Sequence, residues 1–292
     1  MGSLLESSEK GKGDIVMKKS TYKYKNGLTI HTLLIIGSIF MFIPFIWTIL
    51  TAFKTLPEAI QVPPTILPEN YNFSNFTKAL KSLPFFRFYF NTIAVIIIRV
   101  IVSTFFAAMA AYAFARIKFP GRNIMFMFVL IQMMVPTQIF IIPQYLIVQK
   151  LGMLNSIGAL VFPGIVTAFG TFLLRQFFMG LPMELEEAAI IDGANKWQIF
   201  TKIMLPLARS GMISLSIFTA LFAWKDLMWP LIVNSDLEKM PLSAGLAQLI
   251  GQFFTDYPVL MAGSILAITP MVIVFILFQK QFISGVALSG GK

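Results

Sequence analysis

The sequence predicts an all-α membrane protein with six transmembrane helices, and its composition, its apolar periodicity and its charge distribution all support this fold class. The chain of 292 residues is 57% hydrophobic and 12% charged, with 30 Phe and 17 Met, and its mean hydropathy is +0.78. A water-soluble protein needs far more polar residues to cover its surface. The composition therefore excludes a soluble globular protein.

Apolar windows of about 20 residues, the length that a helix needs to cross the hydrocarbon core of a bilayer, recur along the chain. We predict six spans, at residues 30–53, 90–115, 123–142, 156–177, 211–233 and 258–279. Pro44, Pro136 and Pro270 fall inside these windows, where a proline removes a backbone hydrogen bond and favours a kink. Alanines between Ala107 and Ala113 favour close packing of the second span against another helix.

The amino-terminal segment 1–29 carries six lysines and precedes the first apolar run. That run, residues 32–50, is longer than the core of a cleavable signal peptide, and no small-residue cleavage site follows it. We therefore predict that the first span is retained and that the first 16 residues are disordered. The transmembrane domain would occupy residues 30–282, followed by a tail at 283–292.

Basic residues are distributed unevenly between the two sides that six spans create. The side of the amino terminus receives six Lys and Arg in 1–29, three in 116–122, four in 175–209 and two in 280–292, against six on the other side. Because Lys and Arg accumulate in cytoplasmic loops, we predict a multi-pass protein of the cell membrane with both termini cytoplasmic. The long segment 54–87 contains five prolines and is predicted to form turns and extended chain on the outer surface.

Residue types exclude several kinds of chemistry. The chain has no cysteine and a single histidine, His31, and no carboxylates cluster inside the spans, so neither a metal site nor a hydrolytic centre is predicted. The net charge of +10 is spread over short gaps between apolar runs and forms no stripe, which argues against nucleic-acid binding. The positive charges are better explained by membrane topology.

The segment 182–209 is predicted to form two short helices joined by a turn. Its first helix begins with a proline followed by acids, a pattern typical of a helix start: Pro182, Glu184, Glu186 and Glu187. Asp192 and Gly193 form a turn signal. The second helix, which Leu205 and Pro206 would end, carries an apolar stripe of Trp197, Phe200, Ile203 and Met204. An amphipathic hairpin on lipid headgroups is the alternative interpretation.

The same segment resembles the EAA loop of ABC importer permeases. The matching residues, at the spacing of the family motif, are Glu187, Ala188, Ala189, Gly193, Ile203 and Leu205, and Asp192 and Pro206 adjoin them. The resemblance covers the chain from about Thr29 onward and is closest to carbohydrate permeases of the maltose-transporter kind. It is carried further by Thr51 to Lys54, Pro63-Pro64, Asn70-Tyr71, Asn75-Phe76 and Trp224 to Leu231.

This resemblance implies the fold of a type I ABC importer permease and a function in ATP-driven import of a sugar or oligosaccharide. It also implies the partners, which are a second and different permease subunit, two cytoplasmic ATPases and an external solute-binding protein. In the family the EAA loop is a helix-turn-helix that fits a cleft on the ATPase. ATP and Mg would then be bound by that partner, and this chain would hold no cofactor and would not be an enzyme.

Charges inside the predicted spans indicate a second candidate site, a substrate pathway. Arg99 lies in the second span and Lys225 and Asp226 lie in the fifth, where a charge costs about 2.5 to 3.5 kcal/mol on insertion scales. Ion pairing or snorkelling to the interface is the structural explanation. The functional explanation is that Lys225 binds an anionic sugar while the indoles of Trp224 and Trp229 stack on its ring.

Three alternatives remain open at this point. An anionic sugar or glycerol phosphate could replace the oligosaccharide as cargo, and Lys225 motivates this alternative because many members of the family have asparagine there. A secondary transporter driven by an ion gradient would need acids near the bilayer midplane, and Asp226 alone lies near the end of a span. A membrane scaffold or an intramembrane enzyme has no constellation of residues to support it.

Overall fold

The computed structural model describes residues 27–251 and 254–290 and divides the chain into two units, Met1–Trp47 and Thr48–Lys292. Within the described residues all regular elements are helical and no strand occurs. The all-α prediction is therefore confirmed. The predicted disorder of the first 16 residues concerns a segment outside the described ranges.

The first unit contains most of α1, Gly27–Ala52, which has Pro44 in its interior and no charged residue. All side chains from Ile30 to Trp47 are exposed. An uncovered helix of this length and composition matches a bilayer span. Its position coincides with the first predicted span, 30–53.

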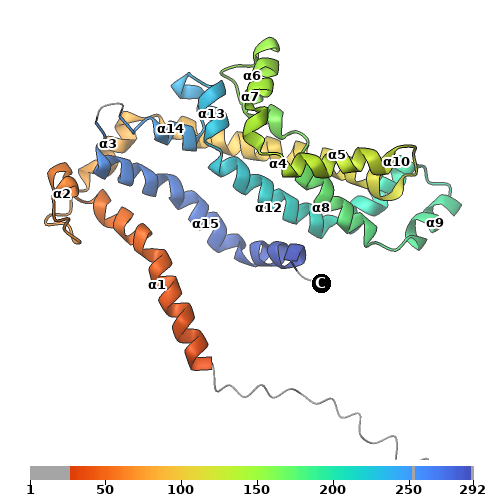
Figure 1. Cartoon of the computed structure of the whole chain (residues 1–292), viewed down its shortest axis with the longest axis horizontal. Coiled ribbons are helices and arrows are strands. Elements are labelled where there is room, and N and C mark those ends of the chain that lie inside the picture. Colours follow the sequence, from red (N-terminus) through yellow and green to blue (C-terminus); the bar gives the residue numbers. More distant parts are fainter. Residues whose placement is uncertain (1–26, 252–253, 291–292) are drawn as a thin grey trace, which may run out of the picture. The chain divides into compact units, whose positions relative to one another are not determined.

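Close packing of three helices forms the centre of the second unit (Figure 1): α4, Phe85–Arg116; α8, Ala168–Met179; and α12, Arg209–Lys225. Ala107, Ala108 and Ala111 on α4 are fully buried there, as their small size predicted. A Cβ atom on Gly170 of α8 would lie 3.1 Å from both the Ala107 Cβ and the Leu215 Cδ2. Small residues therefore set the distance between these helices.

We expect Gly170→Leu to destabilise the protein, because the added side chain has to force α4 and α12 away from α8. Overpacking of this kind costs about 1 to 3 kcal/mol. Gly180→Leu is the matched control, since a Cβ at this end of α8 meets nothing closer than 3.5 Å. Thermal unfolding of the two purified variants checks this prediction, and equal unfolding midpoints would contradict it.

Among the described residues, three helices are individually long and apolar enough to cross a membrane, so the predicted count of six spans requires that each of three bent helix pairs is counted as one span. The three long helices are α1, α4 and α15, Tyr257–Gly290. The other spans are bent by 103°, 48° and 75°. The first, with the 103° bend, combines α5, Arg122–Met134, with η2, Thr137–Phe140, and α6, Ile141–Lys150. The second, with the 48° bend, combines α7, Ile157–Val161, and η3, Phe162–Gly164, with α8. The third, with the 75° bend, combines residues Lys196–Leu207 with α12.

The third predicted span, 123–142, is thus not one straight helix. Pro136 lies at its 103° bend and Val135 before it is extended, with ψ of 127°. A proline disfavours helical geometry in the preceding residue and removes a hydrogen bond, so the helix ends here and restarts in a new direction.

The fifth predicted span, 211–233, begins within a helix as predicted but does not continue as one helix to residue 233. The helix α12 ends at Lys225, Asp226 is extended, and a separate helix follows, α13, Met228–Val233. At the other end, Pro206 does not end the preceding helix but sits in the first turn of α11, Leu205–Leu207, where its missing N–H is not needed. The 75° bend comes instead at Ala208, with ψ of 10°.

The proline-rich segment 54–87 is folded more tightly than predicted. It contains α2, Leu56–Ile60, and α3, Ser74–Ser82. Buried polar side chains organise it: the Asn75 amide donates hydrogen bonds to the Ala52 carbonyl at 2.9 Å and the Lys54 carbonyl at 2.8 Å, and the buried Glu58 carboxylate accepts one from the Glu69 N–H at 2.8 Å. Composition predicted turns here because it does not reveal such long-range hydrogen bonds.

The carboxyl-terminal helices complete the second unit. After α13 come η5, Leu237–Lys239, α14, Leu242–Ala247, and α15, which contains Pro270 and coincides with the last predicted span, 258–279. The helix continues to Gly290 beyond Phe278, whose φ of −110° and ψ of 15° are not helical. Residues 283–290, predicted as a tail, are therefore helical in the described part of the chain.

Candidate functional site

The segment 182–209, which we call the elbow, folds as the predicted helix-turn-helix. Its helices are α9, Glu184–Ile191, and α10, Lys196–Ile199, which continues through the π-helical turn η4, Phe200–Met204. Asn195 and Gln198 form a capping box at the start of α10. The Gln198 N–H donates to Asn195 Oδ1 and the Asn195 N–H donates to Gln198 Oε1, each at 2.9 Å.

Gly193 sets the direction of the turn between the two elbow helices. Its φ is +82°, and a Cβ atom added to it would meet nothing within 4 Å. The position therefore requires glycine for the backbone conformation and not for lack of space. This is the role that the sequence predicted for Gly193.

One face of the elbow is built into the core of the protein. Its inward residues pack with α4 and α8 in a single apolar cluster, to which the elbow contributes Ala189, Ile199, Phe200, Met204 and Ala208. The apolar stripe of the second elbow helix therefore lies mostly against the core of this chain. Phe200 and Met204 are buried inside this chain, Ile203 and Leu205 are half-buried, and Trp197 alone is exposed, by 56%.

The opposite face of the elbow is exposed and mixes charged with apolar side chains. Of the predicted docking residues, Glu187, Ala188, Asp192, Gly193 and Pro206 are exposed. The structure adds Leu185, Ile190 and Ile191, and Ile191 is 86% exposed. The sequence analysis gave these three residues no docking role, because which side of this short helix is buried depends on its packing against the core.

An ion pair joins the elbow to the end of α4. The Arg116 Nε and Glu186 Oε1 atoms lie 3.2 Å apart, and both side chains are largely buried. The Arg116 guanidinium also donates to the Phe178 carbonyl at 2.6 Å and to the Leu181 carbonyl at the end of α8. Burial raises the pKa of the Glu186 carboxyl, and Arg116 and a hydrogen bond from Tyr112 offset part of this rise. Arg116 was not predicted to have any role.

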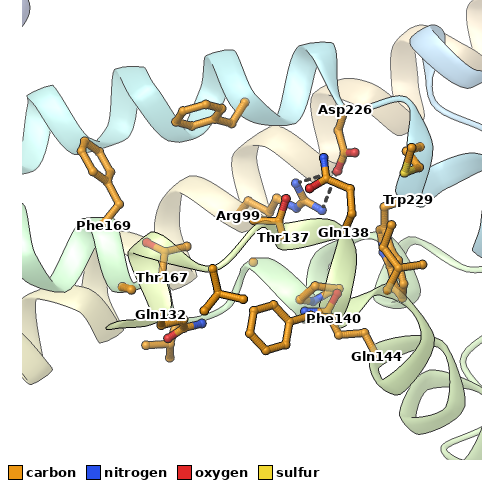
Figure 2. Close-up of a pocket in the computed structure, with 18 of the residues that line it drawn as sticks. Arg99, Gln132, Thr137, Gln138, Phe140, Gln144, Thr167, Phe169, Asp226 and Trp229 are labelled. Carbon is orange, nitrogen blue, oxygen red and sulfur yellow. Dashed lines mark hydrogen bonds and ion pairs between the residues drawn. The ribbon is translucent and has the colours of Figure 1, made fainter. Parts of the chain in front are cut away.

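A cavity of about 760 Å³ lies at the other end of α12, lined by the α5–α6 bend, the start of α8 and the α12–α13 break. Figure 2 shows this cavity. Of the five predicted pathway residues, four line it: Arg99, Lys225, Asp226 and Trp229. Trp224 does not, because it packs against the apolar cluster around Phe88.

Arg99 and Asp226 form an ion pair at the cavity wall, so pairing explains the buried charge of Arg99. The two terminal guanidinium nitrogens each lie 3.2 Å from Asp226 Oδ2, and the Arg99 Nε–H donates to the Leu160 carbonyl at 3.0 Å (Figure 2). A Cβ atom on Gly164 would lie 3.1 Å from Arg99 Nε. A larger residue at this position would therefore displace the guanidinium.

Lys225 is not placed between two indoles as the sequence suggested. Its Nζ lies 4.8 Å from the centre of the Phe222 ring. Trp229 is 93% buried, since its exposed fraction is 7%, and its indole N–H donates to the Ala159 carbonyl at 2.9 Å. Stacking of both indoles on one sugar ring is therefore not supported by this arrangement.

The cavity also contains polar side chains that sequence reasoning missed: Gln132, Thr137, Gln138, Gln144 and Thr167 (Figure 2). All but Thr167 come from the bent pair around Pro136. The signal that could have found them is the recurrence of glutamines on both sides of a proline within an apolar window.

Comparison with known proteins agrees with these features. Residues 103–287, which include the elbow, match the family described as "Binding-protein-dependent transport system inner membrane component". The chain is 36% identical to the arabinooligosaccharides transport system permease protein AraQ of Halalkalibacterium halodurans, over 92% of this chain and 99% of the relative. It is 32% identical to the sn-glycerol-3-phosphate transport system permease protein UgpE of Yersinia enterocolitica, over 89% of this chain and 96% of the relative.

A solved structure has the same fold. It is a bacterial ABC transporter involved in the import of the acidic polysaccharide alginate, with a TM-score of 0.75, 25% identity, and coverage of 88% of this chain and 96% of the matched chain. The family description names an inner membrane component, the two relatives are transport system permease proteins, and the solved structure is an ABC transporter. The chain therefore belongs to the binding-protein-dependent transport system inner membrane component family, whose members are the permease subunits of ABC importers.

Proposed function

We propose that this chain is one of two different permease subunits of an importer that moves a sugar or oligosaccharide across the cell membrane. Two cytoplasmic ATPases drive the import, and an external solute-binding protein delivers the substrate. The observation that carries the proposal is the two-sided elbow. Its inner face is part of the core formed with α4 and α8, and its outer face is exposed. Such a segment can transmit the motion of a docked partner to the transmembrane helices.

The elbow is proposed to dock on the ATPase, which places it and both termini in the cytoplasm. Glu187 is exposed and can pair with a basic group of the partner, while Ile190 and Ile191 supply apolar area. ATP and Mg are bound by the ATPase, and this chain holds no cofactor. Closure of the ATPases moves the elbow and, through Glu186 and Arg116, the helix α4, giving alternating access.

Uptake by a reconstituted assembly tests this function. Proteoliposomes that contain both permeases, the ATPases and the binding protein are supplied with arabino-oligosaccharides, alginate oligosaccharides and sn-glycerol 3-phosphate in turn. We expect uptake of at least one of these probes with internal ATP and none with a non-hydrolysable analogue. Uptake that follows an ion gradient and does not need ATP would favour the secondary transporter instead.

We expect Ile191→Asp to prevent assembly with the ATPase, because it places a charge at the most exposed apolar residue of the elbow. Loss of a central apolar contact costs about 2 kcal/mol or more, which weakens binding by at least about thirtyfold. Co-purification of the ATPase with the permease pair measures the effect. Ile66→Asp, at a residue 69% exposed in the segment between α2 and α3, is the matched control. Equal retention of the ATPase by both variants would contradict docking at the elbow.

A further inference from the structure

We propose that the cavity at the α5–α6 bend binds a sugar or polyol that bears one anionic group, a carboxylate or a phosphate, and that Lys225 is its ionic partner. This inference rests on the proposed function, since it names the substrate class of the permease. It is carried by three features of the described residues: the charge balance of the cavity wall, the position of Lys225, and the polar side chains on the bend.

The charge balance leaves one positive charge in the cavity wall. The ionisable side chains that line the cavity are Arg99, Lys225 and Asp226. Asp226 is paired with Arg99, at 3.2 Å from both terminal nitrogens. In the part of the chain that the structure describes, no carboxylate pairs with Lys225. Lys225 is an exposed side chain, so its charge is accessible to a ligand that enters the cavity.

Lys225 is held at the cavity without being neutralised. Its Nζ lies 4.8 Å from the centre of the Phe222 ring, and both residues line the cavity. A cation over an aromatic face is attracted only weakly, and the ring carries no charge that could cancel that of the ammonium group. Lys225 is also the last residue of α12, where a cation stabilises the helix end. That purely structural role requires no ligand and is the alternative that the test has to separate.

Amide groups on the bend supply neutral hydrogen-bonding partners. Gln132, Gln138 and Gln144 line the cavity; Gln132 and Gln138 are exposed and Gln144 is half-buried, so these amides are accessible to a ligand. An amide both donates and accepts hydrogen bonds, as the hydroxyl groups of a sugar require. The volume of about 760 Å³ lies in the range of ligand sites. The accessible amides favour a sugar over a simple anion, and Lys225 favours an anionic sugar over a neutral one.

The absence of cysteine from the chain allows the cavity to be labelled at one position. Gln138→Cys is introduced into the assembled importer in lipid nanodiscs, and two thiol reagents of opposite charge are applied, methanethiosulfonate ethylsulfonate and methanethiosulfonate ethyltrimethylammonium. Mass spectrometry measures the rate of modification at residue 138. We expect the anionic reagent to be favoured, and Lys225→Met to reduce the ratio of the anionic to the cationic rate by about tenfold. Lys150→Met, at an exposed lysine outside the cavity, is the matched control and should leave this ratio unchanged.

Protection by sugars identifies the ligand class. D-galacturonate and D-galactose differ in the group at one carbon, and sn-glycerol 3-phosphate and glycerol differ in one phosphate. We expect the anionic member of at least one pair to slow the labelling of residue 138, and this protection to be lost with Lys225→Met. A ratio that Lys225→Met leaves unchanged would overturn the proposal, as would equal protection by both members of each pair. So would an unreactive residue 138, because the cavity would then be covered within the assembly.

Failure of this inference can be distinguished from failure of the proposed function. Uptake by the unlabelled wild-type assembly is measured on the same preparation. If uptake requires ATP while labelling does not respond to Lys225, the permease function stands and the anionic sugar site is wrong. If uptake does not require ATP, the proposed function itself is wrong.

Discussion

Replacing Gly193 by valine is expected to reduce ATP-driven uptake by about tenfold or more, because the turn of the elbow needs a backbone conformation that valine resists. The φ of Gly193 is +82°, and an L-residue in this left-handed region costs about 1 to 2 kcal/mol, with β-branched residues worse. The elbow would relieve this strain by changing the angle between α9 and α10. The exposed residues of the two helices would then no longer match the surface of the ATPase.

Gly152→Val is the matched control for this variant. Gly152 also has a positive φ, +66°, and a Cβ atom there likewise meets nothing within 4 Å, but it follows α6 and is not part of the elbow. The two variants share the backbone penalty and differ in location. Uptake and co-purification of the ATPase are measured for both. Wild-type uptake by Gly193→Val, or equal losses in the two variants, would count against a coupling role for the turn.

The second large effect is expected at the ion pair between Arg116 and Glu186. Arg116→Leu removes the partner of a largely buried carboxylate together with the hydrogen bonds to the Phe178 and Leu181 carbonyls. Breaking one side of a buried ion pair costs about 3 to 5 kcal/mol. Glu186→Gln should cost less, because the guanidinium keeps its two carbonyl acceptors. The double variant with leucine at both positions should regain part of the stability, since no unpaired carboxylate remains.

The thermal unfolding midpoint of the purified assembly measures these stabilities, and uptake per ATP hydrolysed measures coupling. We expect the ATPase to dock normally on Arg116→Leu but to hydrolyse ATP with little uptake, because the elbow is no longer joined to α4. Glu184→Gln is the control for Glu186→Gln, since Glu184 is exposed on the same helix and forms no ion pair within the described residues. Full coupling in Arg116→Leu would refute transmission through this contact.

The dependence of stability on pH has a definite sign at Glu186. Burial raises the pKa of its carboxyl in the folded protein above the value in the unfolded chain. The stability that the group contributes is therefore fully present below the unfolded-state pKa and is lost as pH rises through the folded-state pKa. Arg116→Leu should enlarge this loss, because the Arg116 charge offsets part of the rise. Glu186→Gln should abolish it, and unfolding midpoints measured across this pH range check both expectations.

Much of the elbow was predictable from the sequence because its signals are local. Acids after a proline, a turn at Asp192-Gly193 and a periodic apolar stripe are all read within a few residues of one another. The helix pair and the glycine turn were correct for this reason. The burial of the apolar stripe was not predictable, because burial of Phe200 and Met204 depends on α4 and α8 packing over them.

The cavity was only partly predictable. The cost of an intramembrane charge drew attention to Arg99, Lys225 and Asp226, and all three line the cavity. Their partners were not predictable, since Arg99 and Asp226 are 127 residues apart in sequence and the choice between Arg99 and Lys225 depends on which helices touch. The glutamines of the bend were missed because neutral amides attract no attention in an apolar window.

The sequence by itself determined the membrane class, the positions of the apolar windows, the helical elbow and the family resemblance, because composition and short-range spacing fix each of them. Only the tertiary structure decided where the spans bend, which face of the elbow is exposed, that Arg116 joins it to α4, and that Lys225 has no carboxylate partner among the described residues. These features depend on contacts between distant segments. Such contacts are set by the packing of whole helices and not by the residues adjacent in the chain.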